Sequence, residues 1–188
     1  MLEDYPKEIV IKDGTPVILR PVVKEDEPTL NTFFASIPEE ERWFLRDDIA
    51  DPAIMHEWLQ ALDYRLTIPM IAVRESDGII IANLRIHRRR SNCLNHVAHL
   101  RIMVHPEHRG QRLGTWMLLD AVRLAMSVGI EKLVAEFVAD VEAAAIKAAH
   151  RLDFFEHAVL KDYVKDRHGV SRDLIIMIKN VHSEWSDF

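Results

Sequence analysis

The segment Arg109–Gly114 combines residue types that suit phosphate binding. It follows an apolar stretch typical of a β-strand, Val97–Val104, and it precedes a stretch with helical periodicity. The first N–H groups of a helix lack partners within the helix, and the helix dipole favours an anion at that end. Gly110 and Gly114 let the backbone approach a ligand closely, while two arginines add positive charge. The pattern predicts a phosphate-binding loop; a plain strand–helix connection with solvated arginines is the alternative.

Two polar residues interrupt the strand that leads into this loop. Because side chains alternate along a strand, His99, Arg101 and Met103 share one face of it. A central strand covered on both faces is expected to be apolar on both, so we expect this face to line a cleft. Histidine ordinarily titrates near neutral pH, and His99 could therefore accept a proton there, directly or through water. A buried histidine that is hydrogen-bonded for structure is the equally weighted alternative.

Strand-like and helix-like stretches alternate along the whole chain, which predicts an α/β fold. Strands are expected over residues 17–20, 70–74, 79–86, 97–104, 133–138, 158–166 and 172–179. Helices are expected around 30–37, after Asp51, and over 114–128 and 141–152. Asp51-Pro52 is a helix-start signal, because Asp caps the first turn and Pro suits the first helical position. Asp77-Gly78 and His168-Gly169 predict hairpin turns.

Composition and charge limit the classes of protein to which this chain could belong. The 188 residues suit one domain with a hydrophobic core, and 48% hydrophobic and 29% charged residues are ordinary for a soluble protein. The net charge of −6 argues against nucleic acid as the main partner. The basic run Arg85–Arg90 could contact nucleic acid or an acidic substrate, but a solvated strand end and loop is the favoured interpretation. The single cysteine, Cys93, can form no internal disulfide. Apolar runs are too short for a signal peptide or a membrane span, so we expect a cytoplasmic protein.

The histidines near the loop do not form a metal-binding pattern. His96 and His99 are three residues apart near a strand, so they point to opposite faces. The sequence also lacks a cysteine cluster and a helical H-E-x-x-H arrangement. We therefore expect no metal site, and we expect His105 and His108 beside bound phosphates or in solvent.

The loop and its setting are similar to the acetyl-CoA site of the GNAT N-acetyltransferases. That family joins a strand to a helix through R-G-x-G-x-G/A, and Arg109–Gly114 resembles this pattern with Arg112 at the middle glycine. If Arg112 lies in the first helical turn, its backbone can still donate normally. Val17–Pro21 followed by Lys24–Asp26 resembles the family's opening strand and helix start. Tyr5–Pro21 is also similar to GNAT domains fused to acyl-CoA synthetase-like modules, some of which acetylate protein lysines.

This resemblance implies a particular fold and the range of residues that form it. We expect a single GNAT-like domain over residues 1–181, with a mixed, largely antiparallel sheet flanked by helices. A polar tail would follow over residues 182–188. A homodimer formed through the C-terminal hairpin is compatible with the sequence.

The resemblance also implies transfer of an acetyl group from acetyl-CoA to a primary amine by direct attack. The acceptor, a protein lysine, a terminus or a small molecule, is left open. The pyrophosphate is expected on the amides of Arg109, Gly110, Gln111, Arg112, Leu113, Gly114 and Thr115. The pantetheine arm is expected to pair with Ile102, Met103 and Val104, in the manner of an added strand. His99 matches a glutamate general base of the synthetase-fused relatives, and a backbone N–H near Met103 or Val104 would stabilise the oxyanion.

Some family residues are missing. The tyrosine that protonates the leaving thiolate matches Ala149, and the glycine of Y-x-x-x-G-F matches Asp153. Val141-Glu142 stands where the family often has asparagine. These departures keep a second hypothesis open, a noncatalytic acyl-CoA-binding sensor or regulatory module.

Overall fold

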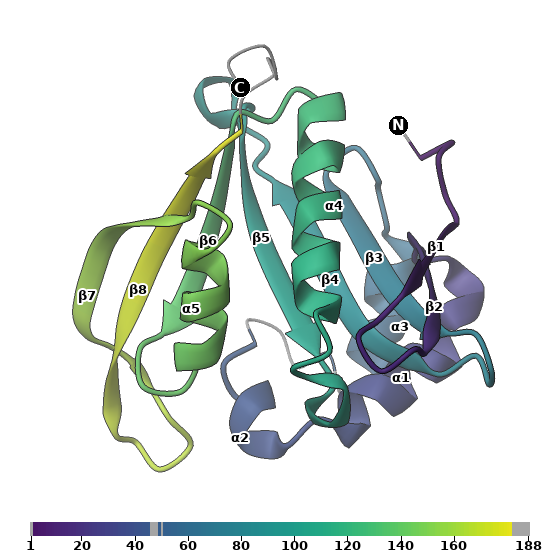
Figure 1. Ribbon diagram of the computed structural model, residues 1–188. Coiled ribbons are helices and arrows are strands. Elements are labelled where there is room, and N and C mark those ends of the chain that lie inside the picture. The colour runs from purple at the N-terminus through teal and green to yellow at the C-terminus, as the bar shows by residue number, and fades with distance from the viewer. Residues whose placement is uncertain (1, 46–48, 50, 182–188) are drawn as a thin grey trace. The chain divides into compact units, whose positions relative to one another are not determined.

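One sheet organises the computed structural model, which describes residues 2–45, 49 and 51–181. Its eight described strands are β1 (Lys7–Val10), β2 (Pro16–Pro21), β3 (Thr67–Arg74), β4 (Ile80–Arg88), β5 (Val97–Val104), β6 (Lys132–Val138), β7 (Phe155–Lys165) and β8 (Ser171–Asn180). They lie in the order β1-β2-β3-β4-β5-β6-β8-β7 (Figure 1). The pairs β1/β2, β2/β3, β6/β8 and β7/β8 are antiparallel, and β5 is parallel to β6. The predicted α/β fold with a mixed, largely antiparallel sheet is confirmed.

The helices begin and end where local chemistry favours it. They are α1 (Glu27–Ser36), α2 (Glu39–Arg42), α3 (Pro52–Gln60), α4 (Leu113–Ser127) and α5 (Ala143–His150). Short 3-10 turns cover Lys24–Asp26, Asn92–Leu94 and Pro106–His108. The Asp51 side chain accepts a hydrogen bond from Ala53 N at 2.8 Å, as predicted for an N-cap. Gly78 and Gly169 have φ values of +72° and +79°, which the predicted turns require.

Two short elements, β1 and α2, were not predicted from the sequence. β1 has four residues and α2 also has four, so neither is long enough to show a clear hydrophobic period. β1 forms only by pairing with β2, from Lys7 opposite Leu19 to Val10 opposite Pro16. The predicted polar tail over residues 182–188 lies outside the described residues.

The chain forms two compact units, and the first holds residues 2–85 and 102–114. We call it the N-terminal unit. Its core joins the apolar sides of α1 and α3 to β3 and the start of β4, through Leu30, Phe33, Phe34, Ile37, Met55, Leu59, Ile71, Val73 and Ile80. Met103 packs against this core. Because Met103 belongs to β5, the core fixes the end of the strand that leads into the predicted loop.

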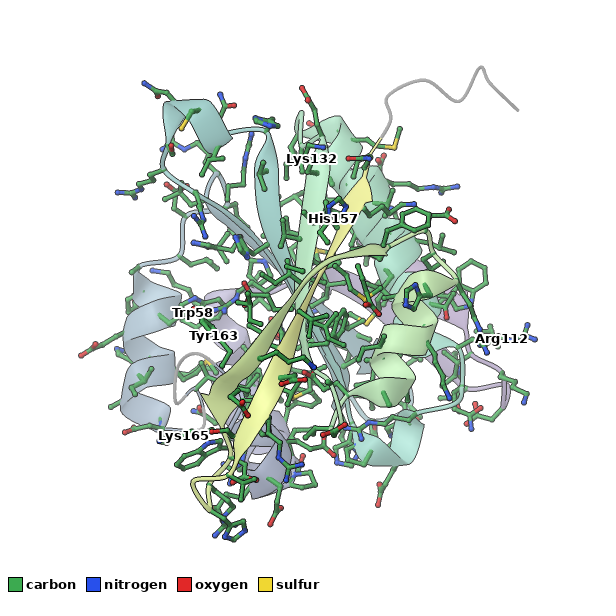
Figure 2. The ribbon with its side chains drawn as sticks, turned by 90° about the vertical axis from the view of Figure 1, so that its left-hand side faces the viewer. Trp58, Arg112, Lys132, His157, Tyr163 and Lys165 are labelled. Atoms are coloured by element: carbon green, nitrogen blue, oxygen red, sulfur yellow. The ribbon has the colours of Figure 1, made fainter. Side chains whose placement is uncertain are left out.

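The second unit, here the C-terminal unit, includes residues 86–101 and 115–181. Within it β6 is central, since it pairs with β5 on one side and with β8 on the other. α5 packs against β6. β7 is an edge strand, and Figure 2 labels three of its residues, His157, Tyr163 and Lys165. Tyr163 is 65% exposed, as befits a strand with only one partner.

Candidate active site

The predicted phosphate loop lies between the end of β5 and the start of α4. After Val104, the backbone N–H of His105 donates to Ile81 O at 2.9 Å, which holds the chain beside β4. A 3-10 turn over Pro106–His108 follows, and α4 begins at Leu113. The residues between them, 109–112, form a turn in which both Gly110 (φ +73°) and Arg112 (φ +64°) are left-handed. Loops with such residues beside a helix N-terminus expose N–H groups that bind anions.

Arg112 differs from the expectation that it could lie in the first helical turn. It precedes α4 and has the left-handed conformation that glycine adopts most easily. Asp153, which also matches a family glycine, has a φ of +60°. At both positions this chain therefore has a side chain on a left-handed backbone.

Relieving this strain gives a stability prediction. A left-handed conformation costs an ordinary L-residue about 1–2 kcal/mol, and Asp tolerates it better than Arg. Arg112→Gly should therefore raise the melting temperature by about 2–8 °C, and Asp153→Gly by less. Differential scanning calorimetry of both variants checks this. A lower melting temperature for Arg112→Gly would show that the Arg112 side chain makes a stabilising contact that outweighs the strain.

Two tethers within the N-terminal unit hold the loop. The backbone N–H of Lys12 donates to Gln111 O at 3.1 Å, just before Arg112. On the other side of Arg112, Leu113 is only 1% exposed. These fixed neighbours explain how Arg112 can be held in a strained conformation. Its own side chain is exposed and available to an anion (Figure 2).

Arg109 makes the second tether. Its Nε donates to Val104 O at 3.0 Å, and its Nη1 donates to Glu41 Oε1 at 3.0 Å. Nη2 donates to the other oxygen of Glu41, so the ion pair is bidentate. We expected the charge of Arg109 to serve a phosphate. In the structure Glu41 of α2 offsets that charge, and Arg109 joins β5, the loop and α2.

Sequence reasoning did not find Glu41 or Lys12. Glu41 is the third of three consecutive glutamates, and nothing in that run distinguishes it as the partner of a residue 68 positions away. Lys12 contributes its backbone N–H to this contact, so its residue type gives no indication of the role.

The two histidines before the loop lie close to each other. The ring centroids of His105 and His108 are 5.9 Å apart. Burial, together with the charges of Arg74 and His105, lowers the pKa of His108 below its ordinary value. His108 is therefore neutral at pH 7, and it adds hydrogen-bonding capacity rather than positive charge near the loop.

The residues expected to contact pantetheine form the last part of β5. Ile102, Met103 and Val104 are half-buried. The side chain of Met103 packs against the core of the N-terminal unit, so the predicted role would fall to its backbone. A Cβ added at Gly114 would lie 3.6 Å from Val104 Cγ2, an ordinary contact, so alanine fits there. This agrees with the G/A choice at the last position of the loop pattern.

His99 lies in the C-terminal unit beside a carboxylate. Its Nδ1 is 3.8 Å from Oε1 of Glu136, and the two side chains are 18% and 25% exposed. His99 is opposite Val134 in the parallel register, which places Glu136 two residues further along the same face of the sheet. A carboxylate at this distance favours the charged form of an imidazole that has accepted a proton.

Arg101 also contacts β6. Its Nη1 donates to Glu136 O at 3.0 Å, and its Nη2 is 3.3 Å from Glu142 Oε1. The other oxygen of Glu142 accepts a hydrogen bond from Val138 N at 2.8 Å. Glu142, at the position where the family often has asparagine, thus links the end of β6 to Arg101 of β5.

The position expected to match a catalytic tyrosine holds no acid. Ala149 of α5 is 2% exposed, and the neighbouring Phe154 is 1% exposed, so both belong to the core. The described part of the chain also contains no group of three or more His, Cys, Asp or Glu residues arranged to hold a metal ion. Among the described helices, none is long and apolar enough to cross a membrane.

Sequence and structure together define the family. Residues 31–154 match the model of the acetyltransferase (GNAT) family, which covers the β5–loop–α4 segment described above. The chain belongs to this GNAT acetyltransferase family. No curated protein matches the chain in sequence.

Solved structures with the same fold include several acetyltransferases. The yncA protein of Salmonella typhimurium, solved with acetyl-CoA, has a TM-score of 0.73 and 20% identity, over 92% of this chain and 98% of that one. A phosphinothricin acetyltransferase of Sinorhizobium meliloti, in complex with acetyl-CoA, has a TM-score of 0.75 and 17% identity, over 92% of each chain. The ribosomal-protein-S5-alanine acetyltransferase of Vibrio fischeri has a TM-score of 0.75 and 17% identity, over 88% and 93%. At these identities the likeness establishes the fold.

Proposed function

We propose that this protein is an N-acetyltransferase that moves an acetyl group from acetyl-CoA to a primary amine. The observation that supports this most directly is the loop at 109–114, where Gly110 and Arg112 are both left-handed and α4 follows at once. Such a backbone presents N–H groups to a diphosphate, and the exposed Arg112 adds a cation. Two structures of similar fold were solved with acetyl-CoA.

In the proposed reaction the amine attacks the thioester directly. The nitrogen lone pair forms the new C–N bond, the carbonyl oxygen becomes an oxyanion, and the C–S bond then breaks to release CoA thiolate. A backbone N–H near Met103 or Val104 stabilises the oxyanion. His99 accepts the proton that the amine loses, and Glu136 stabilises the resulting imidazolium. Because Ala149 replaces the tyrosine acid, water protonates the thiolate or the thiolate leaves unassisted.

The fold alone does not determine which amine accepts the acetyl group. Proteins of similar fold are named for different acceptors, among them phosphinothricin, spermidine and the alanine of a ribosomal protein. A primary amine is the chemical class that these names and the proposed mechanism share. We further propose that the acetyltransferase domain extends over residues 1–181, since β1 and β2 pair with each other and Lys12 holds the loop.

A noncatalytic acyl-CoA sensor is the second candidate function. The buried Ala149 at the acid position is the observation that favours it, because no side chain there can donate a proton. The two functions share the acetyl-CoA loop and differ only in turnover. Release of free thiol in the presence of a panel of primary amines therefore separates them.

Thermal stabilisation tests both candidates at once. A ligand at 100 times its dissociation constant stabilises the native state by about 2.7 kcal/mol, which for a chain of this length raises the melting temperature by about 5–10 °C. Acetyl-CoA should produce this shift, whereas ATP and NAD at the same concentration should produce a much smaller one. An unchanged melting temperature at millimolar acetyl-CoA would contradict both functions.

A further inference from the structure

Three consecutive residues of the loop have backbone N–H groups without an acceptor in the described part of the chain. None of the described groups accepts a hydrogen bond from the N–H of Gly110, Gln111 or Arg112. The N–H of Arg109, by contrast, donates to Pro106 O at 3.3 Å. Free N–H groups on successive residues suit an anion. An anion on the loop would therefore bind at these three residues, and Arg109 can serve it only through its side chain.

The guanidinium of Arg109 already has partners within the N-terminal unit. Its Nε donates to Val104 O at 3.0 Å, its Nη1 donates to Glu41 Oε1 at 3.0 Å, and its Nη2 donates to the other oxygen of Glu41. The carboxylate therefore offsets the charge that Arg109 would offer to an anion. The side chains of Arg109 and Glu41 are 46% and 29% exposed, so solvent and a ligand can reach both.

The backbone around Glu41 is held independently of this ion pair. The N–H of Glu41 donates to Pro38 O at 3.0 Å, and the N–H of Trp43 donates to Glu39 O at 2.9 Å. Ile37, just before α2, is 1% exposed and belongs to the core of the N-terminal unit. These contacts do not involve the carboxylate of Glu41. The carboxylate can therefore release Arg109 while α2 stays in place.

We propose that Glu41 competes with the diphosphate of the donor for Arg109 and thereby sets the affinity of the loop for acyl-CoA. The inference rests on the proposed function, which places the diphosphate on the loop. A guanidinium that makes a bidentate pair with a carboxylate can make the same pair with two phosphate oxygens. Arg109 directly precedes the free N–H groups, so binding must either separate it from Glu41 or bring the diphosphate close to a negative charge.

Both courses lower the affinity of the wild-type loop. Separating the pair loses a bidentate, charge-assisted contact, and keeping it leaves the carboxylate to repel the ligand. Glu41 is thus a positioning residue that acts through Arg109 and takes no part in the chemistry. Removing its charge should tighten donor binding, whereas removing a purely structural support of the loop should weaken it. The sign of the change therefore separates the two roles.

Glu41→Gln tests the competition with little change in shape, since its amide oxygen can still accept from Arg109. We expect the dissociation constant of CoA, measured by isothermal titration calorimetry at low salt, to fall by about 3–10-fold. The gain should shrink as salt rises, because ions screen exposed charges. KM for acetyl-CoA should fall as well, while kcat with one chosen amine at saturating donor stays within about twofold.

Glu40→Gln is the matched control, because it removes the same charge from the same helix at an exposed position. It should change the dissociation constant of CoA by less than about twofold. If Glu41→Gln does not fold, Glu41→Ala removes the same charge and should also tighten binding. Unchanged or weaker CoA binding in a folded variant, or an equal gain from Glu40→Gln, overturns this inference and leaves the proposed function intact. Wild-type protein that binds neither CoA nor acetyl-CoA overturns both.

Discussion

Gly110→Asp is expected to weaken acetyl-CoA binding by about 100-fold, whereas Gly110→Asn weakens it only several-fold. Gly110 is left-handed, and nothing lies within 4 Å of a Cβ added there. A side chain therefore fits, and Asn and Asp are the residues that best tolerate this conformation. The two variants have the same shape and differ by one negative charge.

The charge should act directly on the diphosphate of the ligand. Repulsion between two charges at close range near a protein surface amounts to a few kcal/mol, and about 2.7 kcal/mol corresponds to the expected 100-fold loss. Isothermal titration calorimetry at low and high salt measures it, and the difference between the variants should shrink as salt rises. Equal affinities for the Asp and Asn variants would mean that the diphosphate does not lie on this loop.

His99→Gln is expected to lower kcat at pH 7.5 by about 100-fold or more, with an unchanged dissociation constant for acetyl-CoA. A primary amine with a pKa near that of lysine, about 10.4, is almost fully protonated at this pH and needs a base. As pH rises toward 10, free amine accumulates and the deficit of the variant should shrink. Steady-state rates from pH 7 to 10 check both points.

Two further variants separate a catalytic role of His99 from a structural one. His168→Gln makes the same change at an exposed histidine in the β7–β8 turn and should leave the rates unaltered. Glu136→Gln removes the carboxylate that lies 3.8 Å from His99 Nδ1 and should cause a smaller loss of kcat than His99→Gln. If His99→Gln lowers the melting temperature while its deficit is the same at every pH, His99 is a structural residue.

Local patterns explain why much of the fold could be predicted from the sequence. β5 was expected over Val97–Val104 and has those bounds, because six of its eight residues are apolar and the segment ends before Pro106. The start of α3 followed from Asp51-Pro52, whose capping chemistry depends on neighbouring residues alone. β1 was missed because a four-residue edge strand exists only through its partner.

The candidate site likewise combines features that could be predicted from the sequence with features that depend on the fold. The order of strand, loop and helix, the glycines and the cations of residues 109–114 are properties of the sequence. Whether a cation is available is a property of the fold: Glu41 pairs with Arg109, whereas Arg112 is exposed. Both arginines are cations of the same short loop, and only their surroundings in the fold decide which of them is available.

The sequence by itself determined the class of fold, and it predicted the place of a phosphate loop and the absence of a tyrosine acid at Ala149. Hydrophobic period, capping residues and glycine positions act over a few residues, so they can be interpreted without a structure. Only the tertiary structure decided that Arg112 is left-handed, that Glu41 holds Arg109, and that Arg101 bridges β5 to Glu136 and Glu142. These contacts join residues far apart in the chain, and their partners are selected by packing rather than by local residue type.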